Sequence, residues 1–394
     1  MISCGEPSGD LYAGALVREM RRIDPGVTVS GLGGPALAAA GGVVLEDYRG
    51  LAVTGLTEAI GQVPRSYATL RRLVAAARGE RPDVLVVIDF PDFNLGLVPR
   101  LGLAPIVKRL GIPVVYYIPP QLWAWRPKRL ERIRRVADRV LVIFPFEEAI
   151  YRDGGVPVEF VGHPLVELTA PGTDRAETLA RFGLDPSAAT VALLPGSRAS
   201  EVAHHLPTLI AAAERIRRDL PRAQFLIARA PHLPDALFST QSMQRSQSSE
   251  RSGVSAVPAF AVIEGDTNAV LSAADVVITA SGTATVQTAL HDKPMVIVYR
   301  VSPMTYRLLK RLVKVDMIGM VNLIAGERLV PELIQDAFTA EAVAREATAM
   351  LTDRSRAAHI RAGLARVRER LGGAGASRRA AEAILAVAAA RSSS

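Results

Sequence analysis

The stretch "DVLVVIDFPDFN" (residues 83–94) joins an apolar run to two carboxylates. The run from Val84 to Ile88 is mostly β-branched and contains no polar residue, which is typical of a parallel strand covered by helices on both faces. It stops at Asp89, and Asp92 follows three positions later. Doubly wound sheets bind ligands at the carboxyl ends of their strands, so we expect Asp89 to lie where chemistry takes place.

Two interpretations of Asp89 are open at this point. A carboxylate in this position can act as a general base, a role worth about 10²–10⁴ in rate. It can also cap the turn that follows, as Asp and Asn side chains often do. Asp92 and Asn94 are interpreted as turn and cap residues of the same segment.

Similar apolar runs recur along the chain in two series, with helical stretches such as 11–22 and 65–79 between them. We expect strands at 27–30, 84–88, 113–117, 140–144 and 158–161, and then at 190–194, 223–228, 275–279 and 295–299. If residues 1–4 form a first strand, it is very short. Two such series predict an α/β protein with two doubly wound domains.

The boundary between the two domains is expected in "GHPLVELTAPGTD" (162–174), which is rich in Pro, Gly and Thr. The predicted domains therefore span 1–168 and 169–368. The Ser/Gln-rich segment 239–253 is interpreted as a surface insertion without an assigned function.

Composition narrows the class of protein. The 394 residues are 49% hydrophobic and 22% charged, as in a globular protein large enough for two domains. The apolar runs are far shorter than the roughly 18 residues of a membrane-spanning helix, and "MISCGEPSGD" has no basic signal-peptide start. The single cysteine, Cys4, fits a reducing compartment. We therefore predict a cytoplasmic protein.

The formal net charge of +8 is concentrated in residues 125–139 and 306–314. Such clusters suit phosphate groups or an anionic membrane, and equally a solvated helix face. Nucleic acid is not expected as a partner, because aromatic residues are only 5% and no nucleic-acid-binding module is recognisable. No metal site is expected, because the six histidines lack HExxH or comparable spacing. No other cofactor is expected.

Two glycine-containing turns lie in the first half of the chain. "GEPSGD" (5–10) suits an anion or a sugar at a helix start, although Ser8 and Asp10 are also ordinary capping residues. "SGLGGPALAAAGG" (30–42) matches the dinucleotide-binding glycine pattern only loosely, so a nicotinamide site is disfavoured.

Two further turns lie in the second half and predict a phosphate site. In "LLPGSRASEV" (193–202) Arg198 lies beside a flexible turn, and a guanidinium offers fixed bidentate donors to a pyrophosphate. In "TASGTATVQTAL" (279–290) a helix opens after Ser281 and Gly282, so its N–H groups and dipole point at an anion. Together the two turns favour a nucleotide diphosphate.

Taken in order, these segments resemble the lipid-A-disaccharide synthase family of GT-B glycosyltransferases. The resemblance spans roughly residues 5 to 336 and rests on "GEPSGD", "IDFPDFN", "PQLWAWR", "IFPFE", "FVGHPL", "LPGSRASEV", "ASGTATVQTAL", "YRVSPMTYRLLKRLVKV" and "VNLIAGERLVPELIQ". It implies two Rossmann-like domains facing across a cleft, with a C-terminal helix at 369–394 that packs back on the first domain.

The resemblance also implies a reaction. UDP-2,3-diacylglucosamine would be joined, with inversion, to the 6-hydroxyl of 2,3-diacylglucosamine 1-phosphate, giving a β-1′,6-linked disaccharide and UDP. Asp89 would be the catalytic base, and Glu6 and Ser8 would lie on the acceptor side. The residues expected to bind the UDP donor are Ser197, Arg198, Ser281, Gly282, Thr283, Ala284, Gln287, Asn322 and Leu323.

One position departs from the family pattern. The family usually has Glu where this chain has Gln287. A carboxylate can accept hydrogen bonds from both ribose hydroxyls, whereas an amide accepts through one oxygen only. We therefore expect weaker donor binding without loss of the chemistry.

Acylated substrates imply contact with an anionic membrane, at the cytoplasmic face of the inner membrane. In residues 55–73, Leu56, Ile60, Val63 and Tyr67 recur at near-helical spacing beside arginines, which predicts either a membrane-contact surface or a stripe facing the core. A homodimer is left open.

Three other functions are alternatives. These are another UDP-sugar transferase with a different lipid acceptor, a non-catalytic nucleotide-sugar-binding module and an NAD-dependent oxidoreductase.

Overall fold

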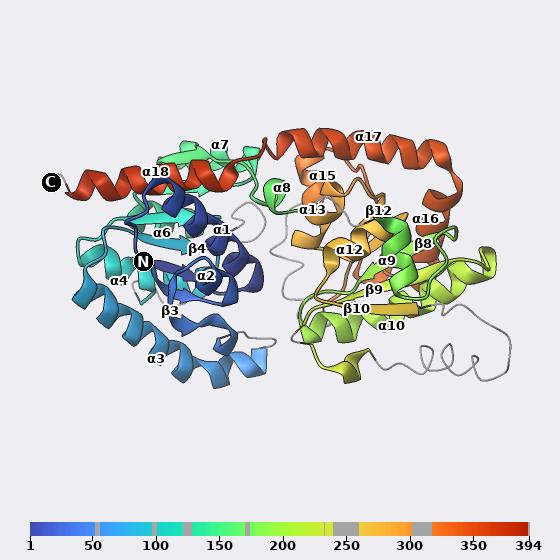
Figure 1. Ribbon diagram of the computed structural model, residues 1–394, viewed down its shortest axis with the longest axis horizontal. Helices are drawn as coiled ribbons and strands as arrows, with labels where there is room; N and C mark the ends of the chain where they lie inside the picture. Colours follow the sequence, from blue (N-terminus) through green and yellow to red (C-terminus); the bar gives the residue numbers. More distant parts are fainter. Residues whose placement is uncertain are drawn as a thin grey trace. The chain divides into compact units, whose positions relative to one another are not determined.

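The computed structural model describes residues 1–51, 56–96, 101–120, 128–169, 174–231, 233–238, 260–301 and 317–392. The insertion at 239–253, both tryptophans and the basic cluster 306–314 lie outside the described residues. The chain divides into two compact units, each of which has its own parallel sheet. Unit 1 comprises Met1–Glu167 and Arg370–Ser394, and unit 2 comprises Leu168–Glu369 (Figure 1).

The sheet of unit 1 has seven parallel strands in the order β3-β2-β1-β4-β5-β6-β7. The strands are β1 (Ile2–Cys4), β2 (Ser30–Gly33), β3 (Val43–Asp47), β4 (Leu85–Ile88), β5 (Val114–Tyr117), β6 (Arg139–Val142) and β7 (Val158–Phe160). Its helices are α1 (Pro7–Ile23), α2 (Pro35–Ala39), α3 (Leu56–Glu80), α4 (Leu103–Arg109), α6 (Lys128–Val136), α7 (Pro145–Asp153) and α18 (Ala376–Ser392). The short helix α8 (Leu165–Leu168) lies where the chain leaves unit 1.

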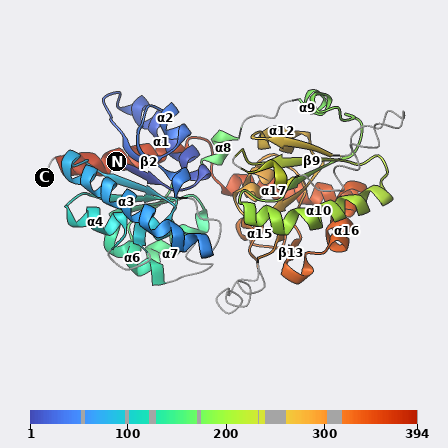
Figure 2. The same cartoon turned by 90° about the horizontal axis from the view of Figure 1, so that it is seen from below.

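Alternate residues of the central strands in unit 1 enter different helix layers, because successive side chains of a strand point to opposite faces. Leu85 and Val87 of β4 pack with residues of α3, α4 and α6 in one core cluster. The other face is covered by α1 and α18, which lie side by side (Figures 1 and 2). The central strands are buried on both faces, which explains their unbroken apolar runs.

Unit 2 has six parallel strands in the order β10-β9-β8-β11-β12-β13. They are β8 (Thr190–Leu194), β9 (Gln224–Arg229), β10 (Phe260–Glu264), β11 (Val276–Ala280), β12 (Met295–Tyr299) and β13 (Glu332–Ile334). The helices are α9 (Arg175–Arg181), α10 (Ala199–Asp219), α12 (Thr267–Ala273), α13 (Thr283–Leu290), α15 (Met320–Ala325), α16 (Ala340–Thr352) and α17 (Arg354–Arg370). Helices α9 and α12 lie on one side of the strands, and α10 and α16 on the other (Figure 2).

Each strand order reverses at one place, between β1 and β4 in unit 1 and between β8 and β11 in unit 2. In doubly wound sheets this topological switch point is where the helices on either side diverge and ligands bind. The predicted α/β class with two doubly wound sheets is therefore confirmed. The two switch points also identify which turns of each unit are suited to bind a ligand.

All but one of the strands predicted in the two series are present, with ends that differ from the prediction by at most two residues. The strand predicted at 27–30 is instead β2 at Ser30–Gly33. Its glycines allow close packing, since a Cβ at Gly31 would lie 1.9 Å from the carbonyl oxygen of Ile2. The sequence prediction missed β3, β10 and β13, which are all edge strands.

In the part of the chain that the structure describes, no helix combines the length and apolar character needed to cross a bilayer.

Candidate active site

The carboxyl edge of unit 1 brings together the segments that follow β1, β4 and β5. Cys4 is in register with Ile88, and Ile88 with Tyr117. Asp89 therefore lies directly beside Gly5 at the switch point. It is half-buried, and it follows a strand that is buried along its whole length.

The backbone of Asp89 is held in an uncommon conformation. Its φ is +46°, in the left-handed region. Its N–H donates to the carbonyl of Ile118 at 3.1 Å, and its own carbonyl accepts from Asn94 Nδ2 at 2.8 Å and from the Tyr116 hydroxyl at 3.0 Å. Asn94 thus does more than cap a turn, since its amide fixes the backbone of the acid.

The charge of Asp89 acts on two buried tyrosines. Burial raises the pKa of Tyr12 and of Tyr116, and the Asp89 carboxylate adds to both shifts. Tyr12 belongs to α1 and Tyr116 to β5, so the carboxylate is close to elements on both sides of its strand. Asp92, in contrast, forms an ion pair with Arg129 of α6.

Glu6 and Ser8 lie in the same region, at the start of α1. Glu6 is the N-cap residue of this helix, and both side chains are half-buried. The prediction that they lie on the acceptor side stays a prediction.

Asp10, two residues further on, has a structural role. Its buried carboxylate accepts hydrogen bonds from the backbone N–H groups of Gly34, Ala36 and Leu37, at 2.7, 2.8 and 3.1 Å. It thereby fills the N-terminus of α2. The glycine pattern at 30–42 therefore has its anion position occupied by the protein's own carboxylate, which argues against a dinucleotide there.

The carboxyl edge of unit 2 presents two turns next to each other, because β8 pairs with β11. Ser197 and Arg198 follow β8 and are exposed. Ser281 and Gly282 follow β11, and α13 begins at Thr283. The structure thus brings the two sequence-predicted phosphate turns together at one switch point, with a helix N-terminus on each.

Glu201 on the first turn of α10 shapes the first of these turns. Its carboxylate accepts from the backbone N–H groups of Ser197 and Arg198, at 3.2 and 3.4 Å, and from the Arg198 guanidinium at 3.2 Å. The side chain of Arg198 remains 45% exposed, against 16% for Glu201. Gly196 is required here, since its φ is +128° and a Cβ would lie 2.6 Å from a Glu201 carboxylate oxygen.

Glu332 of β13 organises the segment before α15. Its two oxygens accept from the backbone N–H of Ile318 at 2.9 Å and of Gly319 at 3.0 Å. The hydroxyl of Ser281 donates to the carbonyl of Ile318 at 3.4 Å, which links this segment to the α13 turn. The start of α15 therefore lies beside the phosphate turns.

The side chain of Asn322 is turned inward and is fully buried. Its Nδ2 donates to the Val330 carbonyl and the Glu332 carboxylate at 2.9 and 2.7 Å, and its Oδ1 accepts from the Val330 N–H at 3.0 Å. All the ordinary hydrogen-bonding positions of the amide except one oxygen lone pair are used within the chain. The Asn322 side chain is thus committed within the chain, while Leu323 is half-buried at the same helix, and the prediction that both residues bind the UDP donor stays a prediction.

Gln287 lies one turn after Thr283 on α13, so the two side chains share a helix face. Gln287 is half-buried and Thr283 is exposed. Ala284, next to Thr283, is half-buried in the same first turn.

His205 was not singled out by the sequence, yet it connects two strand ends of unit 2. Its Nδ1 is 2.7 Å from the carbonyl of Pro195, and its Nε2 accepts from the backbone N–H of Arg300 at 2.9 Å. Burial lowers the pKa of this imidazole. A neutral ring with its proton on Nδ1 satisfies both contacts, so His205 fixes the turn before Arg198. Its position one residue after another histidine gave no hint of this role.

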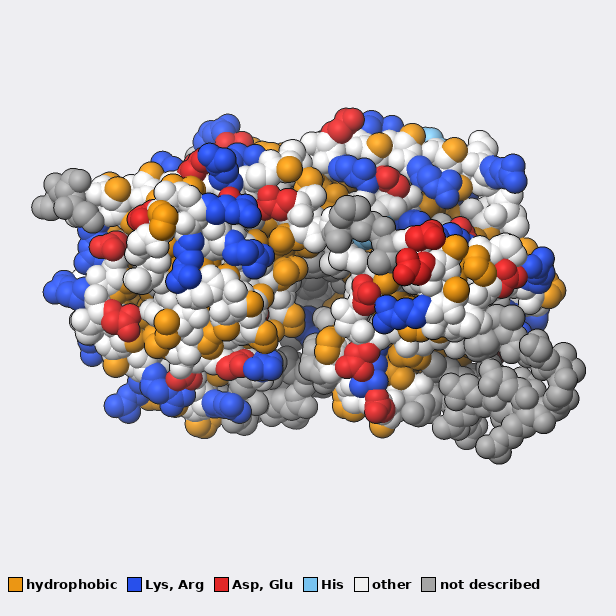
Figure 3. Space-filling view, viewed as in Figure 1, with side chains coloured by type: hydrophobic (Ala, Val, Ile, Leu, Met, Phe, Trp, Pro, Cys, Tyr) orange, Lys and Arg blue, Asp and Glu red, His pale blue; other side chains and the backbone are white. Residues whose placement is uncertain are grey.

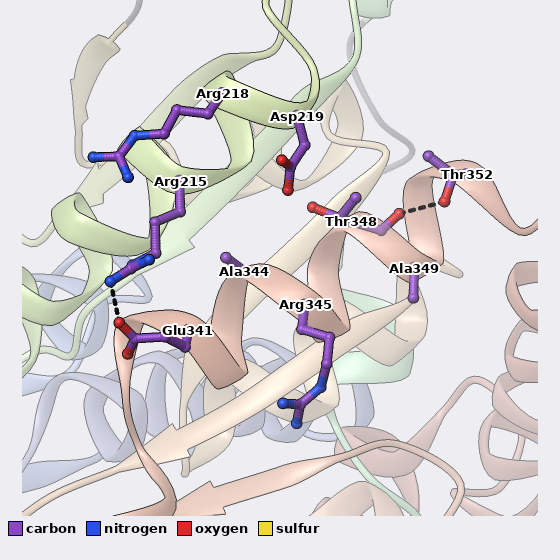
Figure 4. Close-up of a pocket in the computed structure, with 9 residues that line it drawn as sticks. All are labelled: Arg215, Arg218, Asp219, Glu341, Ala344, Arg345, Thr348, Ala349 and Thr352. Carbon is purple, nitrogen blue, oxygen red and sulfur yellow. Dashed lines mark hydrogen bonds and ion pairs between the residues drawn. The ribbon is translucent and has the colours of Figure 1, made fainter.

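A separate hollow of about 520 Å³ lies between α10 and α16 in unit 2 (Figure 4). Arg215, Arg218 and Arg345 line it, and Arg215 forms an ion pair with Glu341. Arg215 lies sixteen residues after the start of α10, or roughly 24 Å along the helix axis from the phosphate turns. The hollow is therefore not part of the switch-point site.

The surface in Figure 3 carries Lys and Arg side chains mixed with Asp and Glu. On α6, which contains part of the basic cluster 125–139, Arg134 and Arg135 both pair with Glu131. Part of this cluster is thus neutralised locally. Within the described ranges no group of three or more His, Cys, Asp or Glu side chains is arranged to hold a metal ion.

Two Rossmann-ordered units in one chain, each with polar groups at its switch point, define the GT-B class of α/β proteins. Solved structures with this fold include a UDP-N-acetylglucosamine 2-epimerase of Neisseria meningitidis bound to UDP-GlcNAc (TM-score 0.64, 11% identity, 98% of each chain covered). Another is the calicheamicin glycosyltransferase CalG4 (TM-score 0.59, 17% identity, 99% of this chain and 97% of that one). At such identities the likeness concerns the fold alone, and the fold hosts more than one reaction.

The sequence comparison is more specific. The chain belongs to the lipid-A-disaccharide synthetase family, whose profile matches residues 1–387. It is 45% identical to the lipid-A-disaccharide synthase of Geobacter metallireducens over 388 residues, which cover 98% of this chain and 96% of the relative. The corresponding enzymes of Geobacter sulfurreducens and Koribacter versatilis are 43% and 41% identical, covering 98% of this chain and 96% and 98% of theirs.

Proposed function

We propose that this protein transfers 2,3-diacylglucosamine from UDP to the 6-hydroxyl of 2,3-diacylglucosamine 1-phosphate, in lipid A biosynthesis. The observation that carries the proposal is the chemistry of the two switch points. Unit 1 offers a carboxylate at its switch point, and unit 2 offers backbone N–H groups, hydroxyls and a guanidinium. The first set suits a hydroxyl nucleophile and the second a diphosphate leaving group.

In the proposed reaction the oxygen of the acceptor 6-hydroxyl forms a bond to the anomeric carbon of the donor. At the same time the Asp89 carboxylate takes the proton of that hydroxyl. The bond from that carbon to the UDP oxygen breaks, and its electron pair leaves with UDP. Attack opposite the leaving group inverts the anomeric centre. The residues of unit 1 therefore supply the base, and no metal is required by this scheme.

Negative charge develops on UDP as it leaves. Arg198 would stabilise it, with Ser197 and the N–H groups of the turn from Ser281 to Ala284 around the phosphates. Gln287 would accept from one ribose hydroxyl. We assign Asn322 a supporting role, in which it holds the backbone around Leu323 against the nucleotide.

The same carboxyl-edge geometry would serve another UDP-sugar transferase, and a binding module would use only the unit 2 half. The test is turnover in detergent micelles with UDP-2,3-diacylglucosamine and labelled diacylglucosamine 1-phosphate, for wild type and Asp89→Ala. We expect labelled disaccharide from wild type and a loss of at least about 10²-fold in the variant, with UDP binding unchanged. Equal rates would remove Asp89 as the base. A folded wild-type protein that binds UDP without making product would overturn the reaction.

We also propose that α3 contacts the cytoplasmic face of the inner membrane, where the acylated substrates reside. Val63 and Tyr67 are 56% and 61% exposed, which opposes a core-facing role for these two, and Arg65 and Arg71 beside them are exposed. Apolar side chains flanked by arginines suit an anionic bilayer surface. The side chains of Leu56 and Ile60 lie outside the described residues, and the homodimer stays a prediction of the resemblance.

Sedimentation with anionic vesicles tests this surface. Val63→Ser combined with Tyr67→Ser should reduce the bound fraction severalfold, because each change removes apolar area that would enter the bilayer. The control is Val43→Ser on β3, a side chain that is 60% exposed but lies on another element. Equal binding by the double variant and wild type would mean that α3 is not the contact surface.

A further inference from the structure

The segment after β4 is strained at two consecutive residues. Asp89 and Phe90 have φ values of +46° and +50°, and Ile118, after the neighbouring strand β5, has +56°. A non-glycine residue in this region is energetically unfavourable and persists only where its surroundings over-determine it. Asp tolerates the left-handed region better than Phe or Ile, so the strain at Phe90 has to be held by packing.

Phe90 packs against Gly5, just after β1, and against Phe93. The ring of Phe90 occupies the place of a side chain at residue 5, since a Cβ on Gly5 would lie 2.1 Å from Phe90 Cγ. The ring also stacks on Phe93, with centroids 5.2 Å apart. The ring of Phe90 in "IDFPDFN" thus explains why "GEPSGD" has a glycine at residue 5. The two motifs pack directly against each other.

The hydrogen bonds converge on the backbone of Asp89. Its carbonyl oxygen accepts from two side chains, Asn94 and Tyr116, which belong to different elements. Asn94 is itself oriented by Ser3 of β1, whose hydroxyl donates to Asn94 Oδ1 at 2.7 Å. All three of these side chains are fully buried, so they do not exchange their partners for water.

We infer that Asn94 and Tyr116 are positioning residues, which fix the Asp89 carboxylate at the switch point by clamping its backbone carbonyl. This inference rests on the proposed function, in which Asp89 is the base. A carboxylate that must take a proton from a bound hydroxyl gains from being held within a fraction of an ångström. A displacement of about 1 Å in such a site costs on the order of 10²-fold in rate.

Kinetics distinguish a residue that positions Asp89 from a residue that only stabilises the fold. A clamp that acts through Asp89 changes kcat and leaves the donor KM unchanged, because the donor turns belong to unit 2. It also has no effect once the carboxylate is gone. Asn94→Ala should therefore lower kcat on the order of 10²-fold in the wild-type background, and should cause no further loss in Asp89→Ala.

Tyr116→Phe is a milder variant that keeps the ring and removes one hydrogen bond, for which we expect a loss of about fivefold in kcat. Its matched control is Tyr151→Phe. Tyr151 is also buried in unit 1, and its hydroxyl donates to a backbone carbonyl, that of Pro120, at 3.4 Å. Tyr151→Phe should keep wild-type kcat.

The experiment measures kcat and donor KM of the full-length chain in the micelle assay, for the four single variants and for Asp89→Ala combined with Asn94→Ala, with thermal unfolding as the folding check. Loss of kcat in Asn94→Ala and no further loss in the double variant support the clamp. Full kcat in Asn94→Ala, or a second loss of equal size in the double variant, overturns it. Should Asn94→Ala fail to fold, Tyr116→Phe against Tyr151→Phe decides, and equal rates of these two would overturn the inference.

Failure of the proposed function gives a different result. If Asp89→Ala turns over like wild type, Asp89 is not the base, and the clamp has no catalytic group to position. If Asp89→Ala is impaired while Asn94→Ala and Tyr116→Phe are not, the base assignment stands and only the clamp is wrong.

Discussion

At the switch point of unit 1, two non-glycine residues in the left-handed region follow β4, and buried side chains hold them there. At the switch point of unit 2, glycines occupy the unusual conformations, Gly196 at φ +128° and Gly282 at +149°. Six strands follow the same order in both units, and unit 1 adds β7 as a seventh. One has an acid fixed by a side-chain network, and the other has two glycine turns, of which the one at Gly282 leaves room for a ligand to approach the backbone closely.

Under the proposed function, this difference fits one fold topology to two chemical tasks. A proton acceptor must be held in place, so its support is rigid and costs local strain. A phosphate is held by many weak donors around it, so its site needs small residues and helix N-termini more than one fixed side chain. Three measurements test this contrast, and the variant that should lose most activity comes first.

Arg198→Ala in unit 2 should lower kcat about as much as the loss of Asp89 in unit 1. We expect a loss in kcat on the order of 10²-fold, because developing charge on UDP loses its guanidinium. Arg198→Lys should lose less kcat, because lysine keeps the positive charge and lacks only the paired hydrogen bonds of the guanidinium. Turnover in the micelle assay measures both.

The control for Arg198 is Arg218→Ala, an exposed arginine at the other end of α10, which should behave as wild type. A kcat for Arg198→Ala within a few-fold of the control would mean that the turn's backbone alone stabilises the leaving group.

His163 should make unit 1 sensitive to acid. Burial lowers its pKa to about 3, and its Nδ1 accepts from the Leu165 N–H at 3.1 Å. The unfolded chain protonates this ring below pH 6.5 while the folded chain does not, so the stabilising contribution is complete above pH 6.5 and falls as the pH falls toward 3. Between pH 6.5 and 5 the loss is about 2 kcal/mol.

His163→Asn keeps an acceptor for the Leu165 N–H and removes the titration. Urea unfolding at pH 6.5 and pH 5 measures the change, and tryptophan fluorescence reports on unit 1, because Trp123 and Trp125 both fall within its sequence range. We expect the free energy of unfolding to depend less on pH in this variant, while the exposed His359→Asn should match wild type. An unchanged dependence in His163→Asn would show that His163 is not the acid-sensitive group.

Gln287→Glu should have the smallest effect of the three. A carboxylate on this face of α13 can accept from two ribose hydroxyls, so the donor KM should fall about fivefold with kcat unchanged. Calorimetric titration with UDP should show tighter binding in the same proportion. An unchanged or higher KM would place the ribose away from Gln287.

Sequence patterns were reliable for the central strands and poor for the edges. β4, β8 and β12 are covered on both faces, so they read as continuous apolar runs. β3 has exposed and half-buried residues in alternation, and β13 has only three residues, so neither carries such a run. The turns predicted to be catalytic and phosphate-binding follow such central strands, so their positions could be predicted from the sequence, whereas their roles stay predictions.

The order of elements and the residue types at the ends of the central strands can be read from the sequence, because both depend on local pattern and neighbouring residues. It also placed an acid after β4 and glycine, serine and arginine after β8. Which polar groups interact across the chain became clear only from the folded arrangement. Asp10 accepts hydrogen bonds from the N-terminus of α2. Asn322 donates to Val330 and Glu332, and Asn94 donates to the Asp89 carbonyl. A polar side chain reveals its chemistry in the sequence, but its partner is chosen by burial and by the approach of distant segments, which no local pattern encodes.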